Sequence, residues 1–155
     1  TQAVGRAGRG INPGQAVIQT YDPTHFAILT AKEQDYLSFY KQEIAYRSLM
    51  SYPPVSQMLV IHCYSKEQDK LEHWSVQIAD EARAFLASSN KKVLLIGPAD
   101  ASIMKINDIY HKVIYMKGFS YDTLIACKDY LEQLELLKQE KLLLVQFDFN
   151  PSSGF

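Results

Sequence analysis

The sequence predicts an α/β fold of the α+β type, in which the larger C-terminal part forms a ferredoxin-like βαββαβ domain. Four segments after residue 55 are rich in β-branched and aliphatic residues, and two longer segments have the apolar spacing of helices. They follow one another as strand, helix, strand, strand, helix, strand. Two right-handed crossovers in this order give a four-stranded sheet with both helices on one face. The other face of the sheet is then left for a partner.

Turn and capping residues bound the elements of this domain. We predict strands over residues 57–64, 91–97, 110–118 and 141–149. The first helix is expected to begin at Ser65, which would form a capping box with Gln68, and the second at Ser120. The stripe predicted to be buried is Leu71, Trp74, Ile78, Ala82 and Phe85 in the first helix, and Leu124, Cys127, Leu131, Leu134 and Leu137 in the second.

The first 52 residues are predicted to form a separate part of the chain. Residues 15–21 have the β-branched content of a strand, and an Asp-Pro pair follows them. Residues 25–50 have mostly helical apolar spacing, with a break near Thr30 to Glu33. Pro53 stops this helix, because it lacks an N–H and disfavours helical backbone at Tyr52. We therefore predict two domains, residues 1–52 and 53–155.

Composition excludes several classes of protein. The 155 residues are 47% hydrophobic with a net charge of -1, so the chain is globular and any anion site must be local. Cys63 and Cys127 form no CxxC pair, which indicates two buried, reduced thiols and no metal site. The apolar runs are too short to span a bilayer and no signal peptide is visible, so we expect a cytoplasmic protein. The absence of an initiator Met indicates a processed chain or a fragment.

The segment "QAVGRAGR" (2–9) places two arginines among small residues. A guanidinium group matches phosphate oxygens, and glycine lets the backbone approach closely, so Arg6 and Arg9 suit a phosphoryl group. No GxxxxGK[ST] phosphate loop occurs in the chain. Two interpretations remain: arginine fingers that act on a nucleotide held by another domain, or an ordinary Gly/Arg-rich terminus.

The segment "QAVGRAGRG" resembles motif VI of the superfamily 2 helicases, and most closely that of the primosomal protein N′, or PriA, family of replication-restart DNA helicases. Further stretches resemble the same family in the same order: "PGQAVIQTYDP", "DYLSFYKQEIAYRSLMSYPPVS", "GPADASIMKINDIYHKVIYMKG" and "FDFNP". The resemblance covers essentially the whole chain. It implies the C-terminal part of an ATP-dependent 3′-to-5′ DNA helicase that restarts stalled replication forks.

The resemblance also implies roles for individual residues. Gln2, Arg6 and Arg9 would be the catalytic residues, in a segment that ends a RecA-like motor lobe whose last strand and helix precede residue 53. ATP and Mg²⁺ would bind elsewhere in the parent protein, and its zinc-binding cysteines would also precede Thr1, so we expect no cofactor on the fragment itself. The implied partners are branched and single-stranded DNA, other primosome proteins and single-strand-binding proteins in the bacterial cytoplasm.

Residues 53–155 would bind DNA through a basic cluster beside the third strand. The candidate DNA-binding residues are Lys105, Tyr110, His111, Lys112 and Lys117. His111 and Asn150 depart from the family, which usually has an arginine and an acidic residue there. The strand aromatics Tyr110, Tyr115, Phe147 and Phe149 either stack on bases or pack in the core. The alternative function is a stand-alone ferredoxin-like module that binds nucleic acid or a regulatory ligand.

Overall fold

A computed structural model of the chain describes residues 16–89 and 91–152. The chain divides into two compact units, Thr1–Tyr46 and Arg47–Phe155. This division falls inside helix α3 (Tyr36–Met50), a few residues before the boundary predicted at residues 52 and 53. Each unit is described by itself.

The described part of the first unit contains helix α2 (Phe26–Lys32) and most of α3. The two helices meet at residues 33–35, which confirms the break expected in the helical pattern. The Asp35 carboxylate accepts a hydrogen bond from the Ser38 backbone N–H at 3.0 Å, and so satisfies one of the free donors at the start of α3.

The strand predicted over residues 15–21 is wrong in its described part, because residues 16–20 have no regular secondary structure. A strand needs a hydrogen-bonded neighbour, and the described residues of this unit supply none. Local bonds take its place at the end of the segment. The Thr20 hydroxyl accepts from the Asp22 N–H at 3.1 Å, a side-chain bond that favours a turn over an extended ladder.

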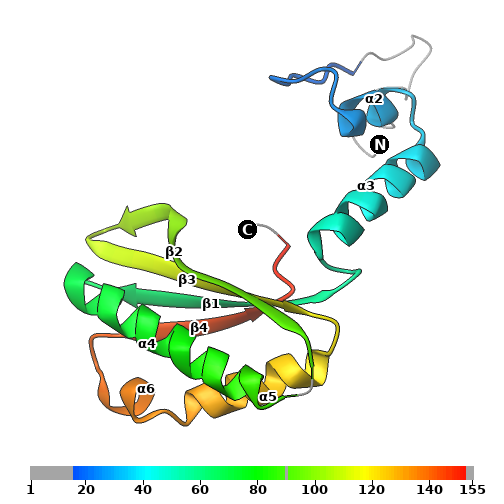
Figure 1. Cartoon of the computed structure of the whole chain (residues 1–155). Coiled ribbons are helices and arrows are strands. Elements are labelled where there is room, and N and C mark those ends of the chain that lie inside the picture. The colour runs from blue at the N-terminus through cyan, green and yellow to red at the C-terminus, as the bar shows by residue number, and fades with distance from the viewer. Residues whose placement is uncertain (1–15, 90, 153–155) are drawn as a thin grey trace, which may run out of the picture. The chain divides into compact units, whose positions relative to one another are not determined.

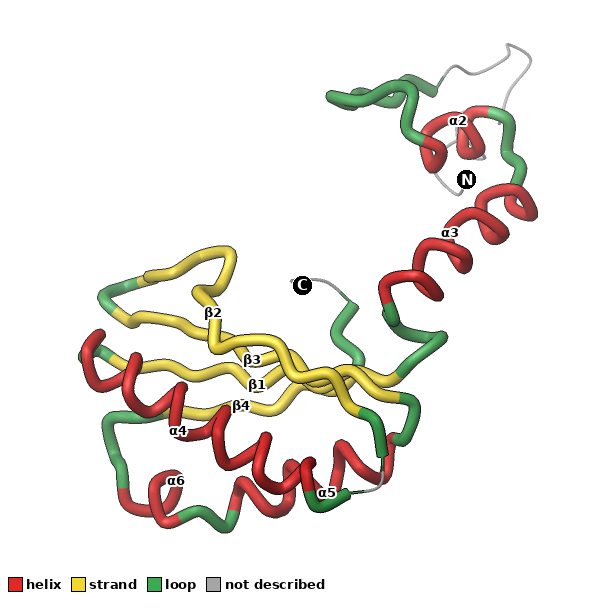
Figure 2. The backbone as a smooth tube through the Cα atoms, viewed as in Figure 1, coloured by secondary structure: helices red, strands yellow, loops and turns green. Residues whose placement is uncertain are grey.

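The second unit has the predicted βαββαβ order. Its elements are β1 (Gln57–Ser65), α4 (Gln68–Ala87), β2 (Val93–Ile106), β3 (Ile109–Gly118), α5 (Tyr121–Glu132), the short α6 (Glu135–Gln139) and β4 (Leu144–Phe149). The strands lie in the order β2-β3-β1-β4, and each neighbouring pair is antiparallel. Helices α4 and α5 cover one face of the sheet (Figures 1 and 2). This is the ferredoxin-like arrangement that the sequence predicts.

The starts of the two long helices differ. Ser120 caps α5 as predicted, because its hydroxyl accepts from the Thr123 N–H at 3.4 Å. The capping box predicted at Ser65 is wrong. Ser65 is the last residue of β1, where it pairs with Tyr110, and its hydroxyl accepts from the Glu67 N–H at 3.1 Å. Glu67 is the N-cap of α4 instead.

Strand β2 continues well past its predicted end at Gly97. The pairing with β3 shifts register between Ile96 and Ala99, so residues 97 and 98 form a bulge rather than a terminus. Gly97 has a φ of +107°, and a Cβ atom there would lie 2.8 Å from the Val113 carbonyl oxygen. Only glycine fits this close approach of the two backbones.

The hydrophobic core lies between the sheet and its helices. Along β1, Leu59, Ile61 and Cys63 point into this core, whereas Met58 and Val60 belong to a smaller cluster on the other face. Both cysteines are buried and free, and Trp74 is only 6% exposed, as predicted.

Candidate nucleic-acid interface

The sheet has one face that α4 and α5 leave uncovered, which we call the open face (Figure 1). Directly paired residues on neighbouring strands share a face, so the register identifies its members. They are Met58, Val60, His62 and Tyr64 from β1; His111, Val113, Tyr115 and Lys117 from β3; Leu94, Ile96 and Ala99 from β2; and Leu144, Gln146 and Asp148 from β4.

Three rings gather at one end of the open face. His62 Nδ1 lies 3.0 Å from His111 Nε2, so the two imidazoles are hydrogen-bonded across β1 and β3. The Tyr64 ring stacks on His111, with ring centroids 4.2 Å apart and planes inclined by 20°. The three side chains are half-buried. Together they form an aromatic surface on the two central strands.

Burial sets the protonation of this histidine pair. It lowers the pKa of His62, which the nearby Asp148 carboxylate partly opposes. It also lowers the pKa of His111, and the charge of a protonated His62 would lower it further. Both rings are therefore neutral at pH 7, with one nitrogen donating and the other accepting. The aromatic surface carries no positive charge at that pH.

Two of the predicted DNA-binding residues, Tyr110 and Lys112, lie on the helix-covered side of β3. The Lys112 ammonium is 2.8 Å from the Glu72 carboxylate and 3.1 Å from that of Asp100, and its side chain is 11% exposed. Tyr110 packs against the main core. Lys112 therefore links β3 to α4 and β2, and two carboxylates balance its charge.

The other two predicted lysines are also engaged. Lys105 pairs with Asp108 at 2.9 Å, and its ammonium lies 4.7 Å from the centre of the Tyr110 ring. Lys117 is 9% exposed; its ammonium donates to the Met50 carbonyl at 3.2 Å and lies 3.8 Å from the centre of the Tyr52 ring. Its role here is to hold the segment before β1 against the sheet.

The structure therefore does not assemble the five candidates into one basic surface. Four of them, Lys105, Tyr110, His111 and Lys112, line a hollow beside the start of α4, together with Glu72 and Asp100. Lys117 lies near the opposite end of β3. The sequence could not reveal these ion pairs, because the carboxylates that neutralise the lysines come from α4, from β2 and from the turn after β2. A DNA-binding role for the five residues stays a prediction.

The aromatic candidates separate by the alternation of the strands. Phe147 and Phe149 pack against the main core, as Tyr110 does, so these rings serve packing. Tyr115 packs against the smaller core cluster on the open face, beside Met58 and Ile96. His62 and Tyr64 were not among the residues predicted to bind DNA. Their alternation with the buried Ile61 and Cys63 was the available signal, since it places both on the face away from the helices.

The predicted catalytic residues Gln2, Arg6 and Arg9 lie outside the described residues. Elsewhere in the chain, the cysteines offer no nucleophile, since burial raises the pKa of Cys63 to about 12 and that of Cys127 to about 11. Within residues 16–89 and 91–152, no three histidine, cysteine or acidic side chains are placed to hold a metal ion. None of the helices in that part is both long and apolar enough to cross a membrane.

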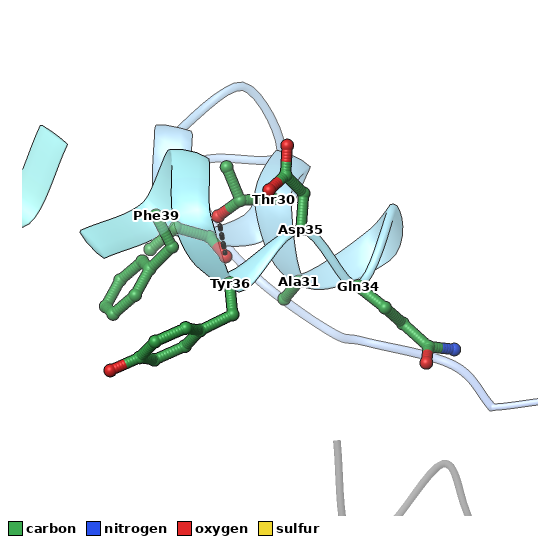
Figure 3. Close-up of a pocket in the computed structure, with 7 residues that line it drawn as sticks. Thr30, Ala31, Gln34, Asp35, Tyr36 and Phe39 are labelled. Atoms are coloured by element: carbon green, nitrogen blue, oxygen red, sulfur yellow. Dashed lines mark hydrogen bonds between the residues drawn. The ribbon is translucent and has the colours of Figure 1, made fainter. Parts of the chain in front are cut away.

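The first unit has a shallow hollow at the junction of α2 and α3. Its lining includes Thr30, Tyr36 and Phe39, and Figure 3 shows the two rings on one side, with the Asp35 side chain directed away from them. The Thr30 hydroxyl donates to the Phe26 carbonyl at 2.8 Å. Asp35 caps α3 and the Thr30 hydroxyl bonds the backbone of α2, so both groups serve the local helix structure.

The elements define a ferredoxin-like α+β domain with both long helices on one face of its four-stranded sheet. Comparison with known proteins identifies the domain further. Residues 48–152 match the family described as the primosomal protein N C-terminal domain. This match covers more than half of the chain, so the chain belongs to the primosomal protein N C-terminal domain family.

Relatives of the chain include several bacterial proteins named replication restart protein PriA. The chain is 34% identical to that of Synechocystis over 134 residues and 32% identical to that of Bacillus subtilis over 153 residues, which are 86% and 97% of this chain. It is 31% identical to that of Thermotoga maritima over 144 residues, 93% of this chain. These alignments cover 16%, 18% and 17% of the three relatives, so the chain spans less than a fifth of their length.

Proposed function

We propose that this chain is the C-terminal part of an ATP-dependent 3′-to-5′ DNA helicase that restarts stalled replication forks. The observation that carries the proposal is the alignment with replication restart proteins along nearly the whole chain, 97% of it in the Bacillus subtilis relative. That alignment extends beyond residues 48–152, where the family domain lies. It favours the helicase over a stand-alone binding module, in which the first unit would be an unrelated tail.

The exposed apolar residues of α3 support a place for the first unit in a larger body. Tyr36 and Leu37 are each 69% exposed and Leu49 is 82% exposed. No residue of α3 is buried. A surface helix with this much exposed apolar area normally packs against another part of its protein. We assign that part to the second motor lobe of the helicase, of which residues 1–52 would be the end.

Within that lobe, Arg6 and Arg9 would be arginine fingers that stabilise the charge on the γ-phosphate of ATP, and Gln2 would position their segment. The nucleotide and its Mg²⁺ would be held by other parts of the parent protein, as would zinc. The chain alone would not hydrolyse ATP, because guanidinium groups without a phosphate loop and a metal site supply only a few charge-assisted contacts.

The second unit would bind branched and single-stranded DNA at the fork, and the parent would act with other primosome and single-strand-binding proteins in the bacterial cytoplasm. Membership of the primosomal family supports this role. The charge of the chain limits how it can bind. With a net charge of -1, strong non-specific attraction to phosphates is absent, so we expect weak DNA binding by the fragment itself.

Arginine substitutions in the full-length protein test the proposed function. We expect Arg6→Ala or Arg9→Ala to lower the rate of DNA-stimulated ATP hydrolysis by about 10³-fold, the scale of arginine-finger losses. Arg83→Ala is the matched control, because the Arg83 guanidinium bonds Asp80 and the Gly97 carbonyl on the second unit. Full ATP turnover in both finger variants, or no ATP hydrolysis by the unaltered full-length protein, would contradict the proposal.

A further inference from the structure

The aromatic rings of the open face lie on the two central strands of the sheet. Tyr64 and His62 come from β1, and His111 and Tyr115 from β3, in the strand order β2-β3-β1-β4. In RNA-recognition domains, which have a four-stranded sheet, rings of this kind stack on two or three unpaired bases. In this chain, the positions of the rings follow from the register of its own strands and the burial of their side chains.

None of these rings belongs to the main core, although Tyr115 packs against the smaller cluster that contains Met58 and Val113. That core contains the alternate residues of β1, such as Ile61 and Cys63, and of β3, such as Ile114. Tyr64 and His111 stack on each other on the other face and are half-buried, so part of each ring stays accessible. A base could therefore add to the stack without opening the protein.

The rings are also spaced for more than one base. His111 and Tyr115 are four residues apart on β3, which is about 13 Å at the usual rise of a strand. Their side chains share a face, because the alternation has a period of two residues. The open face thus has two aromatic positions along one strand, separated by Val113, which is only 2% exposed. Two separated positions match a short single-stranded segment better than one isolated nucleotide.

Polar groups beside the first position suit the edges of bases. A hollow next to β4 is lined by His62, Tyr64, Gln146 and Asp148, and the register places Gln146 directly opposite His62. An amide both donates and accepts hydrogen bonds, and a carboxylate accepts them from amino groups of bases. Such groups would orient a base that stacks on the rings.

The charges around the rings favour contacts with the bases of a nucleic acid over contacts with its phosphates. Near these rings, Lys105 is paired with Asp108, and Lys112 with Glu72 and Asp100. Lys128, in the hollow beside β4, is 2.7 Å from Glu132. With their charges balanced by carboxylates, these lysines attract phosphates weakly.

We propose, on the basis of the proposed function, that the open face binds the bases of single-stranded DNA, one against the Tyr64–His111 stack and a neighbouring one at Tyr115. Stacking supplies most of the affinity, so binding is tolerant of sequence. It depends only weakly on salt, because the lysines near the rings are already paired with carboxylates. The phosphates face solvent.

The test compares two oligonucleotides and four proteins by fluorescence anisotropy. The probes are a labelled 12-nucleotide thymidine strand and the same strand with abasic residues at its central positions. The proteins are the unaltered 155-residue chain, Tyr64→Leu, the Tyr64→Leu/His111→Leu double variant and the control Tyr130→Leu. Tyr130 is a tyrosine of α5 that stacks on Phe85 and donates to Glu81, away from the open face.

We expect the double variant to bind the thymidine strand at least about five-fold more weakly, and Tyr130→Leu to bind it normally. The unaltered chain should lose a similar factor on the abasic strand, which tests the proposal even if a variant misfolds. Equal affinity of the unaltered chain for both strands, or normal binding by a folded double variant, overturns the stacking proposal while DNA binding itself stands. No binding of either strand by the unaltered chain overturns both this inference and the DNA-binding role.

Discussion

His62 and His111 face each other across β1 and β3, with 3.0 Å between Nδ1 of the first and Nε2 of the second. The bond is diagonal, because the register pairs His62 with Val113 and His111 with Tyr64. One proton can be accommodated by the pair, since a protonated ring still donates to its neutral neighbour. Two protons remove the acceptor and place like charges together on a half-buried surface.

This pair predicts that the second unit loses stability in mild acid. Burial lowers the pKa of both rings in the folded state, so the unfolded chain binds protons more readily. The contribution of the two neutral rings to the free energy of unfolding is complete above the ordinary histidine pKa of about 6.5. It is lost as the pH falls from there through the lowered pKa values of the two rings in the folded state. The measurement is the urea midpoint of unfolding between pH 7.5 and 5.

Variants identify the source of that pH dependence. We expect His111→Gln to flatten the decline below pH 6.5, because the pair no longer exists. His73→Gln is the control, since His73 lies on the exposed side of α4 and should leave the decline unchanged. A decline as steep in His111→Gln as in the unaltered chain would show that other groups cause it.

Lys117 is predicted to stabilise the second unit by attaching the segment before β1. Lys117→Ala removes the contact with Tyr52, the hydrogen bond to the Met50 carbonyl and a largely buried stem, so we expect a loss of about 2 kcal/mol in the free energy of unfolding. Burial also lowers the pKa of Lys117, which shows that part of this gain offsets desolvation of the ammonium. Urea denaturation at pH 7 measures the change.

Two further substitutions separate the charge from the stem at this position. Lys117→Met keeps apolar bulk and should cost less than the alanine variant. Lys91→Ala, at an exposed lysine before β2, should change the free energy of unfolding by less than about 0.5 kcal/mol. If Lys117→Ala and Lys91→Ala were equally harmless, the contact with Tyr52 would contribute nothing measurable.

The bulge in β2 predicts an unequal response of two glycines. Gly97→Ala should lower the free energy of unfolding by about 2 to 3 kcal/mol, because alanine resists a φ of +107° and its Cβ would meet backbone atoms of β3. Gly118→Ala should cost clearly less, since its Cβ would meet the movable Val93 side chain at 3.1 Å and no positive φ is involved. Thermal or urea unfolding compares the two, and equal losses would argue against strain at the bulge.

Gly97 also shows where sequence patterns were sufficient and where they were not. Hydrophobic spacing predicted the βαββαβ order and most of the buried stripe of the first helix, because local periodicity follows from burial. The stripe of the second helix was right as far as Leu131, but α5 ends at Glu132, and Leu134 and Leu137 are only partly buried and belong to the separate α6 and its N-cap. The pattern ended the second strand at Gly97, since a glycine between apolar and polar segments is typical of a strand end. The strand continues to Ile106 because β3 pairs with it beyond the bulge. That pairing is a long-range property.

The candidate site was predicted less well than the fold, for a similar reason. Lys112 looked like part of a basic surface, but its partner Glu72 lies on another element, 40 residues earlier in the chain. His62 was not selected, although strand alternation places it on the open face with Tyr64. His111 lies beside His62 only because of the register between β1 and β3. No single segment of the sequence specifies that register.

Asn150 connects the end of β4 to the start of β1 through both its backbone and its side chain. Its N–H donates to the Met58 carbonyl at 2.8 Å, and its side-chain oxygen accepts from the Met58 N–H, also at 2.8 Å. The side-chain amide donates to the Gln57 side chain at 2.8 Å. The residue has a φ of +51°, a conformation that asparagine and aspartate adopt more readily than other residues with side chains.

We therefore predict that the stability of Asn150 variants depends on two properties of the new residue: its tolerance of a positive φ and its side-chain oxygen acceptor. The charge of the new residue should matter little. Asn150→Ala loses the bond to Met58 and strains the backbone, so we expect a loss of about 2 kcal/mol in the free energy of unfolding. Asn150→Gly removes the same bond without the strain and should cost less. Asn150→Asp keeps both the acceptor and the tolerance of positive φ, and should change stability by less than about 1 kcal/mol. Urea denaturation of the three variants gives the order, and an aspartate variant as unstable as the alanine variant would assign the effect to the amide bond with Gln57 instead.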